Sequence, residues 1–227
     1  MIFKRWTEQS AYIYGLWFAD GSIFLQKQNK KYYKRFDITN TDKQIMSKIA
    51  AIMNTKLYRY KRKDKPNWLI CYCIRLYSQE LFDFCYKITG TNKSKHNLNL
   101  PNIPRKVFKH FIRGYFDGDG SIHHVTYNNR HGKQTIELRT SFTAGIDTGN
   151  LLEKLRDAIR TYIPIGFRKV TGRKSHKIAF GQYDSALLCN WMYSNATIFM
   201  NRKKKIWDKS DKKRLLESKK FFTRNKT

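Results

Sequence analysis

The chain has 227 residues, 41% of them hydrophobic, so it is large enough to bury a core as one large domain or two small ones. Its 46 Lys and Arg residues against 17 Asp and Glu give a formal net charge of +29 at pH 7, which predicts a polyanionic partner: nucleic acid first, an anionic membrane surface second. Because no apolar run approaches the ~20 residues that span a bilayer and the N-terminus does not resemble a signal peptide, we expect an intracellular protein without a membrane partner, in a bacterial or phage-infected cytoplasm or in an organelle.

The first half of the chain predicts helices and strands in the order αββαββα. It begins with a helix that ends at Asp20, in the stretch IYGLWFADGSI. Apolar residues then alternate with polar ones in four segments, and two amphipathic segments separate or follow them. These patterns predict strands at 22–28 and 31–39, a helix at 41–54 with a Thr-Asp cap, strands at 57–63 and 67–77, and a helix at 78–89.

The second half repeats the same order of elements. Its first helix ends at Asp119, in the stretch IRGYFDGDGSI, 99 positions after the first motif. The elements that follow are strands at 121–127 and 133–143, a helix at 147–163 with an Asp-Thr cap, strands at 166–172 and 176–183, and a helix at 185–195. We therefore expect an α+β fold of two pseudo-symmetric αββαββα repeats: an N-terminal repeat at 1–103, a connector at about 91–104, and a C-terminal repeat at 104–227 that ends in a basic tail.

Alternation in the second strand of each repeat assigns its two faces. One face should pack on the core, with Phe36 and Ile38 in the first repeat and Ile136, Leu138, Thr140 and Phe142 in the second. The other face carries polar and charged side chains and should be exposed.

Small residues on the two motif helices predict that these helices touch. Gly15 and Ala19 are four apart, as are Gly114 and Gly118, so each helix has a face on which another backbone can approach closely. Either pair alone would indicate ordinary helix packing, whereas two matching copies favour a helix pair about a pseudo-twofold axis.

Asp20 and Asp119 should then emerge together where the paired helices end. Two carboxylates beside the negative ends of two helix dipoles repel each other unless cations lie between them, which favours a divalent metal. Asp117 is not repeated, because Phe18 stands at its position in the first copy. An EF-hand is excluded, since the outer carboxylate positions of that loop are missing.

With these residues in place, the sequence resembles the LAGLIDADG homing endonucleases of the monomeric, two-motif type. The nine motif positions are 13–21 and 112–120, and the order of elements in each half matches the repeating unit of the family. The second copy is the closer match, and the first departs from the pattern at Tyr14, Trp17 and Phe18.

The resemblance implies a sequence-specific, metal-dependent double-strand endonuclease in which the motif helices pack at the interface and two antiparallel, four-stranded sheets form a DNA-binding saddle. It implies Mg²⁺ held by Asp20 and Asp119 with help from the carbonyls of Ala19 and Gly118, and Mn²⁺ or Ca²⁺ able to substitute for binding. One lysine per half is typical of the family, and Lys93 and Lys203 occupy the corresponding segments. For both lysines, a solvated charge or a simple phosphate contact is nearly as good an interpretation as a role in the active site. Asn40, at the end of a strand, is a weaker polar candidate.

The polar strand faces combine Arg, Gln, Asn and acidic residues, a mixture suited to reading base edges in the major groove. The candidates for this readout are Phe24, Gln26, Gln28, Tyr33, Arg35 and Asp37 in the first half and His123, Tyr127, Asn129, Glu137, Arg139 and Ser141 in the second. Basic residues of the second hairpins should contact phosphates, namely Arg59, Lys61, Lys63, Arg75, Arg168, Lys169 and Lys177. Because the two halves share few face residues, we expect a monomer on a long, asymmetric double-stranded DNA target.

A second class of function remains open from the sequence. An intron RNA maturase, or a non-cleaving DNA-binding protein on the same fold, would also be basic and duplicated. Retention of both aspartates favours cleavage, because a binding protein has no need of paired carboxylates at a phosphate. The gene would be carried in an intron or stand free.

Overall fold

The structure is a computed structural model that describes residues 2–28, 31–61, 67, 69–89, 98–128 and 131–217. The elements of the first half follow the predicted order. They are α1 (Glu8–Asp20), β1 (Gly21–Gln28), β2 (Lys31–Asn40), α2 (Lys43–Ile52), β3 (Leu57–Tyr60), β4 (Cys71–Tyr77) and α3 (Gln79–Thr89). Short 3₁₀ turns lie at Ile2–Lys4, Arg105–Val107 and Ile146–Thr148.

The second half begins in the same way and then departs from the repeat. Its elements are α4 (Phe108–Asp119), β5 (Gly120–Asn128), β6 (Gln134–Gly145), α5 (Leu151–Arg160), β7 (Ser175–Phe180), α6 (Gln182–Tyr193), α7 (Asn201–Asp208) and α8 (Lys212–Glu217). Within the described residues the first sheet has four strands in the order β1-β2-β4-β3, and the second has three in the order β5-β6-β7. All pairings in both sheets are antiparallel.

The strand predicted at 166–172 is wrong. In that segment only an isolated bridge between Thr171 and Lys177 pairs with β7. The backbone there bonds to side chains instead: the Gly166 amide donates to Asp184 Oδ1 at 3.1 Å, and Arg156 Nη1 donates to the Arg168 carbonyl at 3.0 Å. Because these groups are already satisfied, the segment does not need a strand ladder.

The predicted Asp-Thr cap of the second-half amphipathic helix is also wrong. Residues 146–148 form a 3₁₀ turn in which the Thr148 hydroxyl donates to the Gly145 carbonyl at 2.6 Å. Gly149 follows with a φ of 62°, so α5 begins at Leu151. In the first half the Thr-Asp prediction is confirmed, because Asp42 is the N-cap of α2 and accepts from the Ile45 amide.

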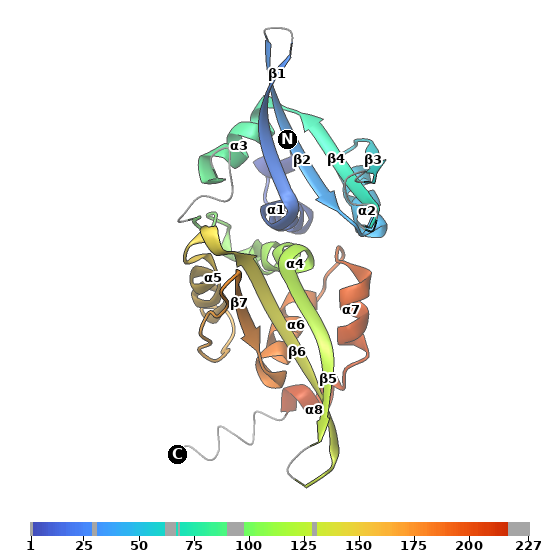
Figure 1. Cartoon of the computed structure of the whole chain (residues 1–227), viewed down its shortest axis with the longest axis vertical. Helices are drawn as coiled ribbons and strands as arrows, with labels where there is room; N and C mark the ends of the chain where they lie inside the picture. Colours follow the sequence, from blue (N-terminus) through green and yellow to red (C-terminus); the bar gives the residue numbers. More distant parts are fainter. Residues whose placement is uncertain are drawn as a thin grey trace.

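The core-facing residues of the two strands follow the predicted alternation with one exception. Phe36, Ile38, Leu138 and Phe142 are buried in one continuous core that extends through both halves. Ile136 was predicted to pack on this face, but it is 52% exposed. It lies toward the tip of the β5–β6 hairpin, which projects beyond the helices in Figure 1, and borders an open surface pocket beside Arg214 and Leu215 of α8.

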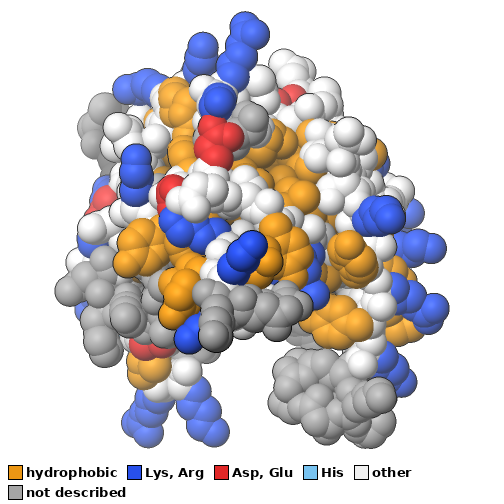
Figure 2. All heavy atoms as spheres, turned by 90° about the horizontal axis from the view of Figure 1, so that it is seen from above, with side chains coloured by type: hydrophobic (Ala, Val, Ile, Leu, Met, Phe, Trp, Pro, Cys, Tyr) orange, Lys and Arg blue, Asp and Glu red, His pale blue; other side chains and the backbone are white. Residues whose placement is uncertain are grey.

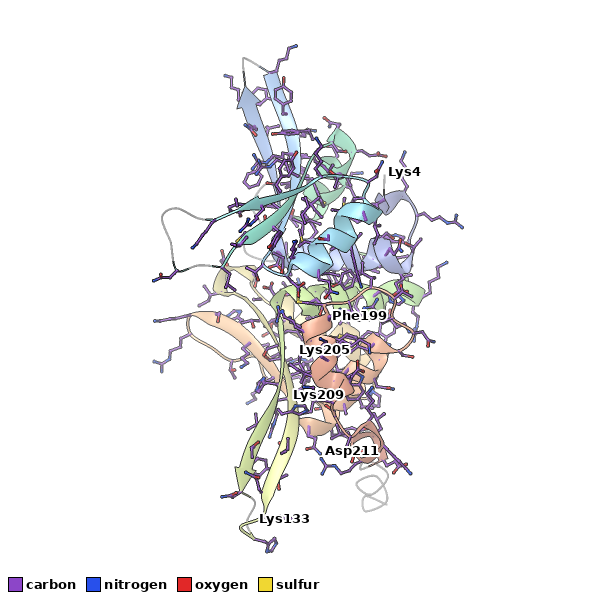
Figure 3. The ribbon with its side chains drawn as sticks, turned by 90° about the vertical axis from the view of Figure 1, so that its right-hand side faces the viewer. Lys4, Lys133, Phe199, Lys205, Lys209 and Asp211 are labelled. Atoms are coloured by element: carbon purple, nitrogen blue, oxygen red, sulfur yellow. The ribbon has the colours of Figure 1, made fainter. Side chains whose placement is uncertain are left out.

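The two motif helices, α1 and α4, lie side by side at the centre of the molecule, and a sheet extends from each toward opposite ends (Figure 1). Seen from the side, the strands lie toward one side and the helices toward the other (Figure 3). None of the described helices is both long enough and apolar enough to cross a membrane.

The contact between α1 and α4 is made backbone to backbone. A Cβ built on Gly15 would lie 2.0 Å from the Phe111 carbonyl oxygen, and one built on Gly114 would lie 2.0 Å from that of Tyr12. Since real Cβ atoms do not approach carbonyl oxygens that closely, any larger residue would push the helices apart. The predicted small-residue contact is confirmed.

We predict that Gly114→Ala destabilises the protein. Alanine is the better helix former by about 1 kcal/mol, but overpacking costs roughly 1–3 kcal/mol or more, so the clash should dominate. Gly181→Ala is the matched control, because a Cβ there meets nothing nearer than 3.6 Å and should change stability by less than about 1 kcal/mol. Urea unfolding of both variants measures the difference, and equal stabilities would contradict the backbone contact.

Candidate active site

Asp20 and Asp119 are the last residues of α1 and α4, and the two helices run in the same direction. A Cβ built on Gly118 would lie 2.3 Å from the Ala19 Cβ and 3.0 Å from Asp20 Oδ2, so the carboxyl-terminal ends meet. Burial, together with the charges of both Asp119 and Asp20, raises the pKa of Tyr115, which places the two acids around one ring. Acids that are 99 positions apart in the chain are therefore neighbours in space.

The glycine after each acid makes room for an aromatic ring. A Cβ on Gly21 would lie 2.0 Å from the Trp17 ring, and one on Gly120 would lie 2.3 Å from the Phe116 ring. Both glycines have negative φ values, −96° and −93°, so they are needed for space rather than for a left-handed turn. The Asp-Gly pairs of the sequence thus let each strand leave its helix directly beside the acid.

Asn40 contacts the first acid. Its Nδ2 donates to Asp20 Oδ2 at 2.6 Å, and its Oδ1 accepts from the Asp42 amide at 2.8 Å, so the second bond fixes which way the amide faces. In the second sheet the equivalent position by register is Ala144, which has no polar side chain. The surroundings of the two acids are therefore chemically different.

Lys203 lies under the second acid and is 3% exposed. Its Nζ donates to the carbonyls of Phe116, Asp117 and Gly120 at 2.6, 2.9 and 2.6 Å, which uses all three of its N–H donors. Burial lowers its pKa to about 8, although nearby carboxylates act in the opposite direction. The ammonium therefore ties together the last turn of α4, the turn that carries Asp119.

Asp117 is buried, and its partners could not be predicted from the sequence. Its Oδ2 accepts from the Tyr12 hydroxyl at 2.6 Å and from the Met200 amide at 2.7 Å. Burial raises the pKa of Asp117 to about 6. The side chain joins both motif helices to the segment that leads into α7.

A second buried group, also missed from the sequence, fixes the same segment. The Arg113 guanidinium is fully buried and donates to the carbonyls of Ile198 and Met192 and to Glu8 Oε1, the last at 2.7 Å. Glu8 also accepts from the Thr197 amide. A charged residue on the packed face of an apolar helix was the available signal, but its partners lie 79 to 105 positions away.

On the first sheet, the register places most of the predicted readout residues on one face. Phe24 lies opposite Arg35, and Gln26 opposite Tyr33. The Arg35 guanidinium lies 4.3 Å from the centre of the Phe24 ring, and its Nη1 donates to Gln26 Oε1 at 3.0 Å. Arginine, glutamine and aromatic side chains thus form one connected surface.

Asp37 was expected on this surface but is only 5% exposed. Its carboxylate lies 3.2 Å from Arg35 Nε and 3.4 Å from Arg75 Nη2. Burial raises the pKa of Asp37, and the two arginines oppose that rise. It holds two arginines in position rather than standing free.

The second sheet brings its predicted face residues together in the same way. His123 lies opposite Arg139, and the Tyr127 hydroxyl donates to Glu137 Oε1 at 2.5 Å. Glu137 also forms an ion pair with Arg139. Ser141, expected to be exposed, is 2% exposed.

The predicted phosphate contacts divide into several groups. Arg75 and Lys177 share the faces described above, whereas Arg59 pairs with Tyr72 and lies on the opposite face of its sheet. Lys61 and Lys169 are exposed and lie outside the strands. The predictions that lie outside the described residues or side chains are Gln28, Lys63, Lys93 and Asn129.

The exposed surface is strongly basic, as composition predicted. Figure 2 looks onto the end of the molecule at the first sheet and shows Lys and Arg side chains interleaved with hydrophobic ones and few acidic groups. The exposed aromatics of this sheet include Tyr33, Tyr58, Tyr60 and Tyr77. Such a surface suits a nucleic acid, since it offers both charge and apolar contact.

The donors at the paired helix ends suit a hard divalent cation. Carboxylates of Asp20 and Asp119 and the carbonyls of Ala19 and Gly118 are all oxygen ligands, which Mg²⁺ and Ca²⁺ prefer. Across the described part of the chain, no group of three or more His, Cys, Asp or Glu side chains is gathered as a metal site. A cation held here would complete its coordination with water and phosphate oxygens.

Comparison with known sequences gives partial matches. No protein-family model matches the chain. It is 31% identical over 113 residues to the DNA-directed RNA polymerase subunit Rpo1C of Methanocaldococcus jannaschii, a match that covers 49% of this chain and 12% of that protein. It is 24% identical over 119 residues to an uncharacterized protein of the same organism, covering 51% of this chain and 40% of that one. These matches span less than half of either relative.

Solved structures match over most of the chain. A mutant of I-SmaMI superposes with a TM-score of 0.62 at 12% identity, covering 90% of each chain. The LAGLIDADG homing endonuclease I-LtrWI, bound to target DNA, gives 0.58 at 14% identity over 88% of this chain and 90% of that one. The LAGLIDADG meganuclease I-AabMI, bound to uncleaved DNA, gives 0.59 at 14% identity over 92% and 91%. The chain therefore has the fold of the LAGLIDADG homing endonucleases, as its two motifs predicted.

We predict that Lys203→Met lowers stability by roughly 1–3 kcal/mol, because three buried carbonyls lose their donor. Lys205→Met is the matched control, since Lys205 is exposed on the same helix (labelled in Figure 3). Thermal and urea unfolding should separate the two variants. If both retain wild-type stability, Lys203 does not hold the end of α4.

Proposed function

We propose that the protein is a sequence-specific homing endonuclease that makes a metal-dependent double-strand break in a long, asymmetric DNA target. The observation that carries this proposal is the meeting of Asp20 and Asp119 at the ends of two parallel helices. Two acids held together beside two negative helix ends are unfavourable without a cation, so the arrangement is suited to metal binding and not to stability alone.

The residues of the chain prepare this site for phosphodiester hydrolysis. A divalent cation, when bound, supplies an activated water and neutralises charge on the phosphate. Asp20 and Asp119 would hold it, with the carbonyls of Ala19 and Gly118 nearby. Asn40 orients the Asp20 carboxylate through its 2.6 Å bond, and Lys203 fixes the turn beneath Asp119.

The two sheets would read the DNA through the major groove. Arginine suits guanine and glutamine suits adenine, so Arg35 and Gln26 are base-reading candidates, and Asp37 holds Arg35 in place. The first sheet presents more aromatic surface than the second, which supports an asymmetric target.

Structures of similar fold support DNA as the partner. I-LtrWI and I-AabMI are described bound to DNA, and I-SmaMI is described bound to an uncleaved DNA target in the presence of calcium ions. For this chain, DNA and a divalent metal are part of the proposal. We further propose that it acts as a monomer, since a single chain supplies both acids.

We predict that Asp20→Asn and Asp119→Asn each abolish double-strand cleavage and leave DNA affinity largely intact. Asparagine keeps the shape of each side chain and an acceptor for Asn40 but removes the charge that a cation needs. A binding duplex can first be selected from a random pool in Ca²⁺ and then placed in a supercoiled plasmid. Linear product in Mg²⁺, and none with EDTA, measures cleavage.

The same assay separates the alternatives. A wild-type protein that binds the selected duplex but never linearises the plasmid in Mg²⁺ or Mn²⁺ would be a non-cleaving binding protein. Undiminished cleavage by both variants would remove the aspartates from the reaction. Loss of binding together with lowered unfolding temperatures would make the aspartates structural.

A further inference from the structure

The second sheet contains a surface pocket of about 320 Å³. Residues of β5, β6 and β7 line it, together with the start of α6. Its polar lining consists of side chains with nitrogen or hydroxyl groups: His123, Arg139, Thr140, Ser141, Arg168 and Lys177.

Two guanidinium groups meet at one edge of this pocket. A Cβ built on Gly181 would lie 3.6 Å from Arg139 Nη1 and 3.8 Å from Arg168 Nη2, so both arginines border the same glycine. Gly181 also precedes α6 as its N-cap and has no side chain to cap that helix. Positive charge from Arg139 on β6 and from Arg168, in the segment before β7, therefore converges where a helix begins.

Ser141 lies within this pocket with an unused hydroxyl. It is 2% exposed, and its Oγ has no hydrogen-bond partner. Burying a hydroxyl without a partner costs free energy, and such groups usually mark the place of a ligand or water. The hydroxyl can donate to a group that enters the pocket.

The first repeat has a carboxylate at the position that Ser141 holds in the second repeat. Gly21 pairs with Ile38 and Gly120 pairs with Phe142, so Asp37 and Ser141 hold equivalent positions one residue before each. In the first sheet, the Asp37 carboxylate lies between Arg35 and Arg75. The second sheet has a neutral hydroxyl at that position, within the wall of the pocket.

Carboxylates near this pocket do not neutralise all of its cations. Glu137 pairs with Arg139, and Asp184 accepts from Arg168 at 2.7 and 3.0 Å. No described carboxylate pairs with the Lys177 ammonium, although Lys177 lies on the same face as Arg139. The pocket keeps net positive charge where the other repeat holds an internal anion.

We propose that this pocket binds an oxyanion, a single backbone phosphate of the bound DNA, in the place that the Asp37 carboxylate fills in the first repeat. Several donors from different directions suit the tetrahedral oxygens of a phosphate, whereas a base edge is read by a planar pair. The identity of the phosphate as part of DNA rests on the proposed function, but the oxyanion pocket does not.

The pocket lies close to Asp119, so a phosphate bound in it would position the DNA relative to that acid. Ser141 pairs with Ser121, two residues after Asp119. A phosphate anchored there would fix the DNA backbone close to the second acid. The first half makes no equivalent contact, because its own carboxylate already occupies the position.

The first test uses inorganic phosphate and the folded full-length protein. Side-chain Nε–H signals of arginine in ¹⁵N-labelled protein report on Arg139 and Arg168, assigned by Lys substitution. We expect saturable shifts of both signals in the wild type and their loss in Ser141→Asp, which supplies the carboxylate internally. Ser175→Asp is the matched control, since it adds the same charge on β7 outside the pocket and should keep the shifts.

Unchanged arginine signals in the wild type, or equal shifts in Ser141→Asp, would overturn the pocket. Ser141→Ala serves as a second variant, because it cannot clash and should weaken phosphate binding while retaining the wild-type unfolding temperature. Undiminished phosphate affinity in that variant would exclude the hydroxyl as a donor and overturn its part in the site.

The second test uses a duplex DNA. For Ser141→Asp, the slope of log affinity against log salt should become shallower by ~0.9, the value of one phosphate contact, and should change less for Ser175→Asp. An unchanged slope alongside positive phosphate titrations would overturn the assignment to DNA. If the plasmid assay shows no cleavage while both of these tests succeed, the nuclease proposal fails and the phosphate pocket stands.

Discussion

Direct contact between the backbones of α1 and α4 is the constraint on which the rest of the structure depends. Gly15 and Gly114 each face a carbonyl oxygen of the opposite helix, with no space for a Cβ. Because the helices touch this closely and run in the same direction, their last residues, Asp20 and Asp119, have no freedom to separate. The sheets leave these helix ends through Gly21 and Gly120, so the same contact also sets where the strands begin.

The two repeats share this framework but stabilise it with different chemistry. Around α1 the packing is aromatic, with Trp17 stacked between Tyr14 and Phe36 at 5.7 Å from each. Around α4 one of the corresponding positions is charged: Phe116 stands where α1 has Trp17, but Arg113 stands where α1 has Tyr14, and its guanidinium donates to backbone carbonyls near 192–198. The rings around α1 pack through their shape alone. Arg113 of α4 instead binds a distant segment, and that segment leads to Lys203 at the end of α4.

Local sequence patterns predicted the fold well, but they could not predict polar contacts between residues far apart in the chain. Alternation and helix periodicity depend on neighbours in sequence, so the motif helices, the strand faces and the meeting of the two acids followed from the chain. The strand predicted at 166–172 failed because Asp184 and Arg156, outside the segment, bind its backbone. Likewise, Lys203 was recognised as a candidate, but its three carbonyl partners lie more than 80 positions away.

Three acidic residues of this chain lie where they orient arginine side chains. Asp37 lies between two arginines, Asp184 holds Arg168, and Glu8 holds Arg113. Since these carboxylates are used internally, most of the +29 charge stays on the outside, where like charges repel and oppose the compact state. A polyanion across the sheets would relieve that repulsion, and anything that binds the folded state alone also stabilises it. Binding of a polyanion and folding stability would thus be linked through the same lysines and arginines.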